Sequence, residues 1–261
     1  MKSVQKFYDL DKTERAEVVS RIKRELLLGL QQKKRSRIIS FFDDQDTYIR
    51  KAAYLSAGRI YFEELGLQAD IIQLLENMLA HESFRVRQTA LNAAGEISKA
   101  DFGAAEHLFD KGLFDEHHSP RNAVIGSIKK AGEVNPKPVL KWAAKYLHHP
   151  DKEVRREICH GLELRGRKYP GDILPLLKQL QHDKAPRVRN TLVHVIGQIS
   201  YKEGCLAIVV EDLKKWENLQ LVEDALQEII DVHDRYSNFA PMTQKQAKEY
   251  IKRNFKQVNT L

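Results

Sequence analysis

The segment PRVRNTLVHVIGQI, residues 186–199, has four related segments earlier in the chain. They are TYIRKAAYLSAGRI at 47–60, FRVRQTALNAAGEI at 84–97, SPRNAVIGSIKKAGEV at 119–134 and KEVRREICHGLELRG at 152–166. Alignment brings one arginine of each segment into register, with successive spacings of 37, 34, 34 and 34 residues. A fixed period of this length is typical of stacked repeat units. The aligned arginines are Arg50, Arg87, Arg121, Arg155 and Arg189.

Apolar residues recur at helical spacing within each segment, as at Val188, Leu192, Ile196 and Ile199. Each segment therefore predicts a helix with one apolar face. Between these segments lie further apolar stretches of similar length, such as DIIQLLENMLAH and CLAIVVEDLKKW, and no stretch shows sustained strand alternation. Each unit is thus predicted to be helix, turn, helix. The sequence predicts an all-α fold, an α-solenoid of the ARM/HEAT type with about six helical hairpins and helical caps.

The repeat pattern also predicts a division of the chain into three parts. Residues 1–44 are expected to form an N-terminal helical cap, 45–234 the repeat array and 235–261 a C-terminal capping helix. One further period after Arg189 leads to Glu223, where the charge is reversed, as expected of a terminal repeat. Helix starts are predicted at N-cap residues and first-turn prolines, namely Asp46, Ser83, Ser119 with Pro120, Asn135 with Pro136, and Asp151.

A glycine follows the aligned arginine by eight residues in three units, in the pairs Ala57-Gly58, Ala94-Gly95 and Ile196-Gly197. Units three and four instead carry glycine eleven residues after the arginine. This pattern, over roughly residues 46–231, resembles the short HEAT repeats of phycobilisome lyases and many bacterial scaffold proteins. Glycine inside a helix costs about 1 kcal/mol relative to alanine. We therefore expect these glycines to allow close approach of the next helix.

The excess of positive over negative charge is confined to one stretch of the chain. Residues 137–191 contain seven Lys and six Arg against three Asp and three Glu, a net charge of +7 that equals the charge of the whole chain. Such a local excess attracts phosphate backbones or acidic proteins. The residues predicted to bind nucleic acid or another polyanion are Arg121, Arg155, Arg156, Arg165, Arg167, Lys168, Arg187 and Arg189.

The aligned arginines allow two interpretations. A cation in the first turn of a helix opposes the helix dipole, so each arginine needs a compensating partner. In the first interpretation the arginines form a structural ladder with neighbouring acids or carbonyl groups, a common feature of short HEAT families. That ladder would comprise Arg50, Arg87, Asp46, Asp151 and Asp183. In the second, they line a concave groove and face a ligand.

Residues 135–255, including TQKQAKEYIKRNF, also resemble the HEAT-like family of bacterial DNA alkylation-repair glycosylases and their non-catalytic relatives. The resemblance implies a concave basic groove for DNA. Those glycosylases use a catalytic aspartate, but the corresponding stretch here reads HHSPRNAVIG, with Arg121 and Asn122 and no acid. The two tryptophans, Trp142 and Trp216, stand at apolar positions and are predicted to pack in the core. The resemblance therefore favours DNA binding without catalysis.

Other chemistry finds little support in the sequence. Cys159 and Cys205 stand apart, the pairs His117-His118 and His148-His149 have poor spacing for a metal, and no nucleotide or hydrolase motif occurs. We therefore predict no catalytic residue, metal, cofactor or small-molecule substrate. The start of the chain lacks a signal-peptide pattern and no apolar run is long enough for a membrane span, so we expect a cytoplasmic protein. A protein-interaction scaffold and a lesion-specific glycosylase remain the alternatives to polyanion binding.

Overall fold

The computed structural model describes residues 7–255, and every regular element in that range is a helix. This confirms the predicted all-α solenoid of helical hairpins. None of the helices between residues 7 and 255 has both the length and the apolar character that a membrane span requires. The chain folds as two compact units, Met1–Asn135 and Pro136–Leu261. The division at 1–44, 45–234 and 235–261 stays a prediction, and residues 1–6 and 256–261 of it lie outside the described range.

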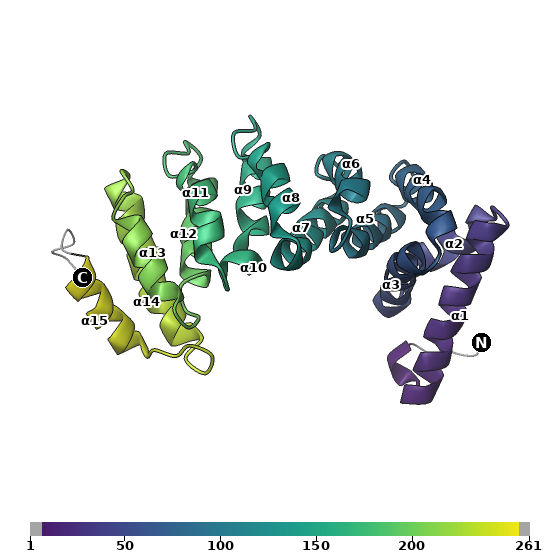
Figure 1. Ribbon diagram of the computed structural model, residues 1–261, viewed down its shortest axis with the longest axis horizontal. Coiled ribbons are helices and arrows are strands. Elements are labelled where there is room, and N and C mark those ends of the chain that lie inside the picture. Colours follow the sequence, from purple (N-terminus) through teal and green to yellow (C-terminus); the bar gives the residue numbers. More distant parts are fainter. Residues whose placement is uncertain (1–6, 256–261) are drawn as a thin grey trace. The chain divides into compact units, whose positions relative to one another are not determined.

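The first unit contains three of the arginine-bearing helices. These helices, α3, α5 and α7, pack against one another in chain order, while α4 packs beside α6 (Figure 1). Two rows of helices result, as expected of stacked hairpins. The elements are η1 (Phe7–Asp9), α1 (Lys12–Gln31), α2 (Arg35–Phe42), α3 (Thr47–Glu63), η2 (Leu65–Leu67), α4 (Gln68–Met78), α5 (Phe84–Ser98), α6 (Phe102–Gly112) and α7 (His118–Val134).

The second unit repeats this arrangement. Helix α12 packs between α9 and α14, and α11 packs against α13, so the same two rows recur. The first helix of its first complete hairpin is broken into α9 and the short α10. The elements are α8 (Pro136–Ala144), α9 (Lys152–Gly161), α10 (Glu163–Gly166), α11 (Pro170–Lys178), α12 (Pro186–Gln198), α13 (Cys205–Leu213), α14 (Leu219–Arg235) and α15 (Gln244–Asn254).

The apolar positions identified from the repeat form the core. Val188, Leu192 and Ile196 are completely buried, as the helical spacing predicts. Trp142 and Trp216 are also buried, and the indole N–H of Trp216 donates to Asp212 at 2.9 Å. The two tryptophans are therefore core residues whose apolar rings are buried, and the polar N–H of Trp216 has a hydrogen-bond acceptor.

The predicted helix starts are partly correct. Asp46 and Asp151 are N-caps, and each accepts a hydrogen bond from the backbone N–H two residues later. Ser83 precedes α5 as expected, but its hydroxyl donates to Asp43 instead of capping the helix. The prediction for Ser119 is wrong, because α7 already begins at His118. There the ring of His117 accepts from the backbone N–H of Ser119 at 3.1 Å and takes the capping role.

The glycines mark places where consecutive units approach closely. A Cβ atom added to Gly95 of α5 would lie 2.6 Å from Cβ of Ser127 in α7. At Gly197 of α12 the same atom would lie 2.6 Å from Cγ of Glu228 in α14 and 3.0 Å from Cγ2 of Val232. The lost helix propensity is thus offset by closer helix packing, as the repeat pattern predicts.

We predict that Gly95→Ala lowers the free energy of unfolding. Ser127 is small and buried, so it cannot turn away, and the clash should cost about 1–3 kcal/mol. The added Cβ would also lie 3.3 Å from Cα of Ser127, so we expect the upper part of this range, which exceeds the roughly 1 kcal/mol gained in helix propensity. Urea unfolding followed by circular dichroism measures the change. Gly126→Ala is the matched control, since an added Cβ meets nothing within 4 Å there and should stabilise the helix. Equal stabilisation by both changes would contradict the close-packing account.

Candidate functional site: the face of helices α9 and α12

The five aligned arginines each occupy the fourth position of their helix and bind the turn that precedes it. Nη1 of Arg155 donates to the carbonyl oxygens of His149 at 2.7 Å and Pro150 at 2.9 Å. Nη1 of Arg189 donates in the same way to the carbonyl oxygen of Asp183 at 2.6 Å. These carbonyl groups compensate a cation that lies in the unfavourable first turn. The equivalent bonds join Arg50 to Asp44, Arg87 to His81 and Arg121 to Asp115.

Two of these arginines also pair with an acid of the next helical repeat. Arg155 binds Asp183 through Nε at 2.5 Å and Nη2 at 2.9 Å, and Arg87 binds Asp115 at 2.7 and 3.0 Å. The side chains are largely buried: 15% of Arg155 and 5% of Asp183 are exposed, and 8% of Arg87 and 9% of Asp115. Both pairs are bidentate, the strongest geometry for such contacts. Removing one member of a buried pair typically costs about 3–5 kcal/mol.

The electrostatic balance at Asp183 favours its charged form. Burial acts to raise the pKa of its carboxyl group. The hydrogen bonds from Arg155 and from the backbone N–H of Ala185, with the charges of Arg155 and Arg189, outweigh this effect and lower the pKa. The hydrogen bonds that Arg155 donates to Asp183 likewise raise the pKa of Arg155 above its ordinary value. Both side chains of the pair are therefore charged, and the pair links two consecutive helical repeats.

A second repeated position was not identified from the sequence. The residue six places before each arginine is an aspartate or a histidine, and its side chain accepts the backbone N–H two residues later. Asp183 accepts from Ala185 at 2.8 Å, and Nδ1 of His149 accepts from Asp151 at 3.1 Å. The repeat register contains this signal, because all five residues align once the arginines are aligned. They are Asp44, His81, Asp115, His149 and Asp183.

Several predicted nucleic-acid-binding residues make internal contacts. Arg165 binds Asp172, with Nε 2.8 Å from the carboxylate, and Arg167 binds Glu163 at 2.5 Å. Lys168 is exposed beside the ring of Tyr169, in the loop before α11. Arg121, Arg155 and Arg189 each bind the turn before their own helix, and Arg121 lies in the first compact unit. For these six residues, a role in nucleic-acid binding stays a prediction.

The remaining two predicted residues, Arg156 and Arg187, lie together. They line a shallow surface groove between α9 and α12, which are neighbouring helices in the second unit (Figure 1). The side chain of Arg187 is 65% exposed and that of Arg156 is 21% exposed. The groove is lined throughout by polar side chains, and we call it the α9–α12 groove. Its lining residues are Arg156, His160, Arg187, Asn190, Thr191 and His194.

Acids lie beside both arginines of the α9–α12 groove. Glu153 contacts Nε of Arg156 at 3.0 Å and Nε of Arg187 at 3.4 Å, and Arg156 also binds Glu157. Glu153 is 36% exposed, so water screens these ion pairs. A phosphate group can therefore compete with Glu153 for the two guanidinium groups, whereas the buried pair of Arg155 and Asp183 offers no such access.

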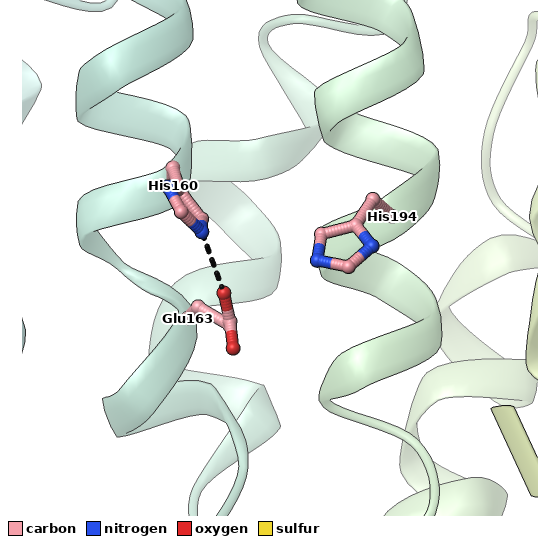
Figure 2. Close-up of side chains that lie close together, drawn as sticks. All are labelled: His160, Glu163 and His194. Carbon is pink, nitrogen blue, oxygen red and sulfur yellow. Dashed lines mark ion pairs between the residues drawn. The ribbon is translucent and has the colours of Figure 1, made fainter. Parts of the chain in front are cut away.

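Two histidines occupy equivalent positions in the α9–α12 groove. His160 and His194 are 34 residues apart, one full repeat, and their ring centroids are 6.2 Å apart. Glu163 of α10 lies beside them, with 3.1 Å between its carboxylate and Nε2 of His160 (Figure 2). These three residues offer nitrogen and oxygen donors for a metal. Neighbouring Cys159 is buried, and burial raises the pKa of its thiol, so it stays protonated.

Comparisons with known proteins agree with this architecture. Residues 139–228 match the family model described as HEAT repeats. No curated protein matches the sequence. The second unit therefore carries HEAT repeats, and the class of the chain is that of helical-repeat solenoids, the class predicted from the aligned arginines.

Among solved structures, AlkD2 from Streptococcus mutans has a TM-score of 0.53 at 17% identity, covering 75% of this chain and 97% of that one. The protein smu.31 from Streptococcus mutans UA159 has a TM-score of 0.47 at 17% identity, covering 80% and 96% of the two chains. The CpcE–CpcF complex of phycocyanin lyase from Nostoc sp. PCC7120 has a TM-score of 0.38 at 16% identity, covering 87% and 90%. At this level of identity, the likeness to AlkD2 shows the fold alone.

We predict that Asp183→Asn destabilises the second unit by about 3 kcal/mol near neutral pH, because it leaves Arg155 buried without its anion. The pKa of Asp183 is lowered in the folded state, so its contribution is present above the unfolded pKa of about 4 and is lost as pH falls through the folded value. The difference between wild type and variant should therefore shrink in acid. Urea unfolding at a series of pH values measures it.

The matched control for this change is Asp172→Asn. Asp172 also pairs with an arginine, Arg165, but is 42% exposed, so its loss should cost no more than about 1 kcal/mol. Equal losses of stability in both variants would contradict the assignment of Arg155 and Asp183 as the link between consecutive repeats. A loss of stability in Asp183→Asn that does not depend on pH would contradict it as well.

Proposed function

We propose that this chain is a binding module that holds a polyanion, with duplex DNA as the specific candidate, against the α9–α12 groove. The observation that carries the proposal is the convergence of Arg156 and Arg187 on one exposed groove, within the stretch that holds the whole net charge of the chain. The solenoid fold supports a binding role, since stacked repeats present extended surfaces.

Further cations extend the positive surface at the start of both helices. Lys152 is the first residue of α9, and Lys184 lies two residues before α12; both are exposed. Guanidinium groups bind phosphate oxygens in bidentate fashion, while lysines add flexible point charges. Four cations are therefore proposed to receive phosphate groups: Arg156 and Arg187 in the groove, and Lys152 and Lys184 at the starts of its two helices.

The polar residues of the groove suit contacts to the backbone of a nucleic acid. Asn190 and Thr191 add an amide and a hydroxyl group to the groove, and the hydroxyl of Thr191 donates to the carbonyl oxygen of Arg187 at 3.0 Å. Such side chains bind phosphate and sugar oxygens and fix the register of a protein on a duplex without reading its sequence. The proposal is thus for binding dominated by phosphate contacts.

We predict that binding of a duplex of about 20 base pairs weakens steeply between roughly 50 and 200 mM salt. Four phosphate contacts give a slope of about −3.5 in a plot of log binding constant against log salt concentration. Arg187→Ala should weaken binding and reduce the magnitude of this slope by about 1, since one contact is lost. Fluorescence anisotropy with labelled DNA measures both quantities.

Lys51→Ala is the matched control. Lys51 follows Arg50 as Arg156 follows Arg155, and it is exposed on α3 in the first unit, outside the basic stretch. Its loss should leave the affinity within about twofold. Binding that ignores salt, or an equal loss in Lys51→Ala, would contradict the proposal. A stoichiometric protein partner that survives nuclease treatment, without DNA binding, would assign the chain to the interaction scaffolds instead.

We further predict that Glu153→Gln tightens DNA binding by about threefold, or roughly 0.7 kcal/mol. The change removes the carboxylate that competes with phosphate for both Arg156 and Arg187. Glu211→Gln on α13 is the control, because Glu211 forms a solvent-exposed pair with Lys214 and does not line the groove. Unchanged or weakened binding by Glu153→Gln would show that the two arginines do not receive the phosphate groups.

A further inference from the structure

We propose that His160, Glu163 and His194 form a binding site for a divalent transition-metal ion, and that Zn²⁺ fits it best. One donor atom from each residue lies within 4.8 Å of the other two. The three side chains come from α9, α10 and α12, and they face one another at the surface of the second unit (Figure 2). Neither the sequence motifs nor the polyanion-binding proposal accounts for this arrangement.

The distances are close to those that a metal requires. With metal–ligand bonds of about 2.0–2.1 Å, neighbouring donors of a tetrahedral site lie about 3.3 Å apart. Nε2 of His160 and Oε2 of Glu163 already lie 3.1 Å apart. His194 must approach by at most about 1.5 Å to complete the triangle, since its donor lies within 4.8 Å of the others. Its side chain is 45% exposed, which leaves room for such a rotation.

The surroundings orient the ligands. Glu163 is buried, and Arg167 donates to its other oxygen, Oε1, at 2.5 Å while also donating to Gln198 at 2.6 Å. Nδ1 of His194 lies 3.7 Å from a carboxylate oxygen of Glu228, just beyond hydrogen-bond distance, and that oxygen also pairs with Arg235 at 3.2 Å. Figure 2 shows the second ring nitrogen of His194 directed toward Glu163. A carboxylate behind a histidine is the usual support of a metal-binding imidazole, because it fixes the tautomer and ring orientation.

The repeat register produces the site. His160, His194 and Glu228 occupy the same position in three successive units, each 34 residues from the next. The preceding equivalent position is Gly126, so side chains that can bind a metal begin at this position in the fourth repeat, the one that contains Arg155. Glu163 enters the cluster because the helix breaks between Gly161 and Glu163, where α10 begins. Stacking of equivalent residues thus brings together donors that are remote in sequence.

The donor set selects the class of metal. Two imidazoles and one carboxylate suit Zn²⁺ and related first-row ions, whereas Ca²⁺ and Mg²⁺ prefer oxygen ligands alone. His160 is 37% exposed and His194 is 45% exposed, so the remaining coordination position opens toward the groove. Arg167 and Arg156 oppose a cation, and three ligands hold it less tightly than four. We therefore expect a dissociation constant of about 1–10 µM.

Isothermal titration calorimetry of the tag-free full chain with ZnCl₂ tests the proposal. We expect one Zn²⁺ per chain, and at least a tenfold loss of affinity in His194→Ala. His182→Ala is the matched control, because His182 also pairs with a glutamate, Glu217 at 3.5 Å, but belongs to no such cluster. Its affinity should equal that of wild type. Circular dichroism verifies that both variants are folded.

Co²⁺ provides a second readout that a purely structural ion pair would not produce. Co²⁺ bound by two imidazoles and a carboxylate should give intense visible absorption bands of a four- or five-coordinate ion, and His194→Ala should abolish them. No saturable Zn²⁺ binding, or equal losses in His182→Ala and His194→Ala, would overturn the proposal. The titration contains no nucleic acid, so its outcome is independent of DNA binding.

Discussion

The structure depends on one repeated interaction, the hydrogen bonds from the aligned arginine to the carbonyl oxygens of the turn before its helix. A guanidinium group has five donors in fixed directions, so one side chain can fix a turn and still reach the next unit. In Arg87 and Arg155 the remaining donors bind a buried aspartate of the following unit. The aligned arginine therefore stabilises the turn before its own helix and, at Arg87 and Arg155, also binds the next repeat.

Some arginines of the basic stretch stabilise the fold, and others face a surface that a ligand can reach. Arg155 and Arg156 are neighbours in sequence but lie on different faces of α9. Arg155 binds Asp183 among buried groups, while Arg156 faces the α9–α12 groove. The net charge of the basic stretch thus overstates the number of cations that a ligand can reach. The proposed binding surface depends on Arg156, Arg187 and the exposed lysines at the helix starts.

The sequence predicts the fold well and the site only in part. Period, apolar spacing and the glycines identify the helices and their stacking, because these features repeat and depend on backbone geometry. The partner of each arginine depends on side-chain direction, so Asp115 was not foreseen. Asp46 and Asp151 fulfil the capping role predicted for them, whereas a role in the arginine ladder stays a prediction. His160 and His194 could have been found from the register, but Glu163 depends on the break between α9 and α10, for which the sequence has no clear signal.

The central functional claim is that DNA binds at the α9–α12 groove. Hydrogen exchange of the full chain, with and without a short DNA duplex, tests this claim most directly, because it locates the contact surface without any mutation. The account predicts slower exchange in α9 and α12 and in the turns before them, with little change in α3 and α5. Protection confined to the first unit, or no protection at DNA concentrations that saturate binding, would contradict it.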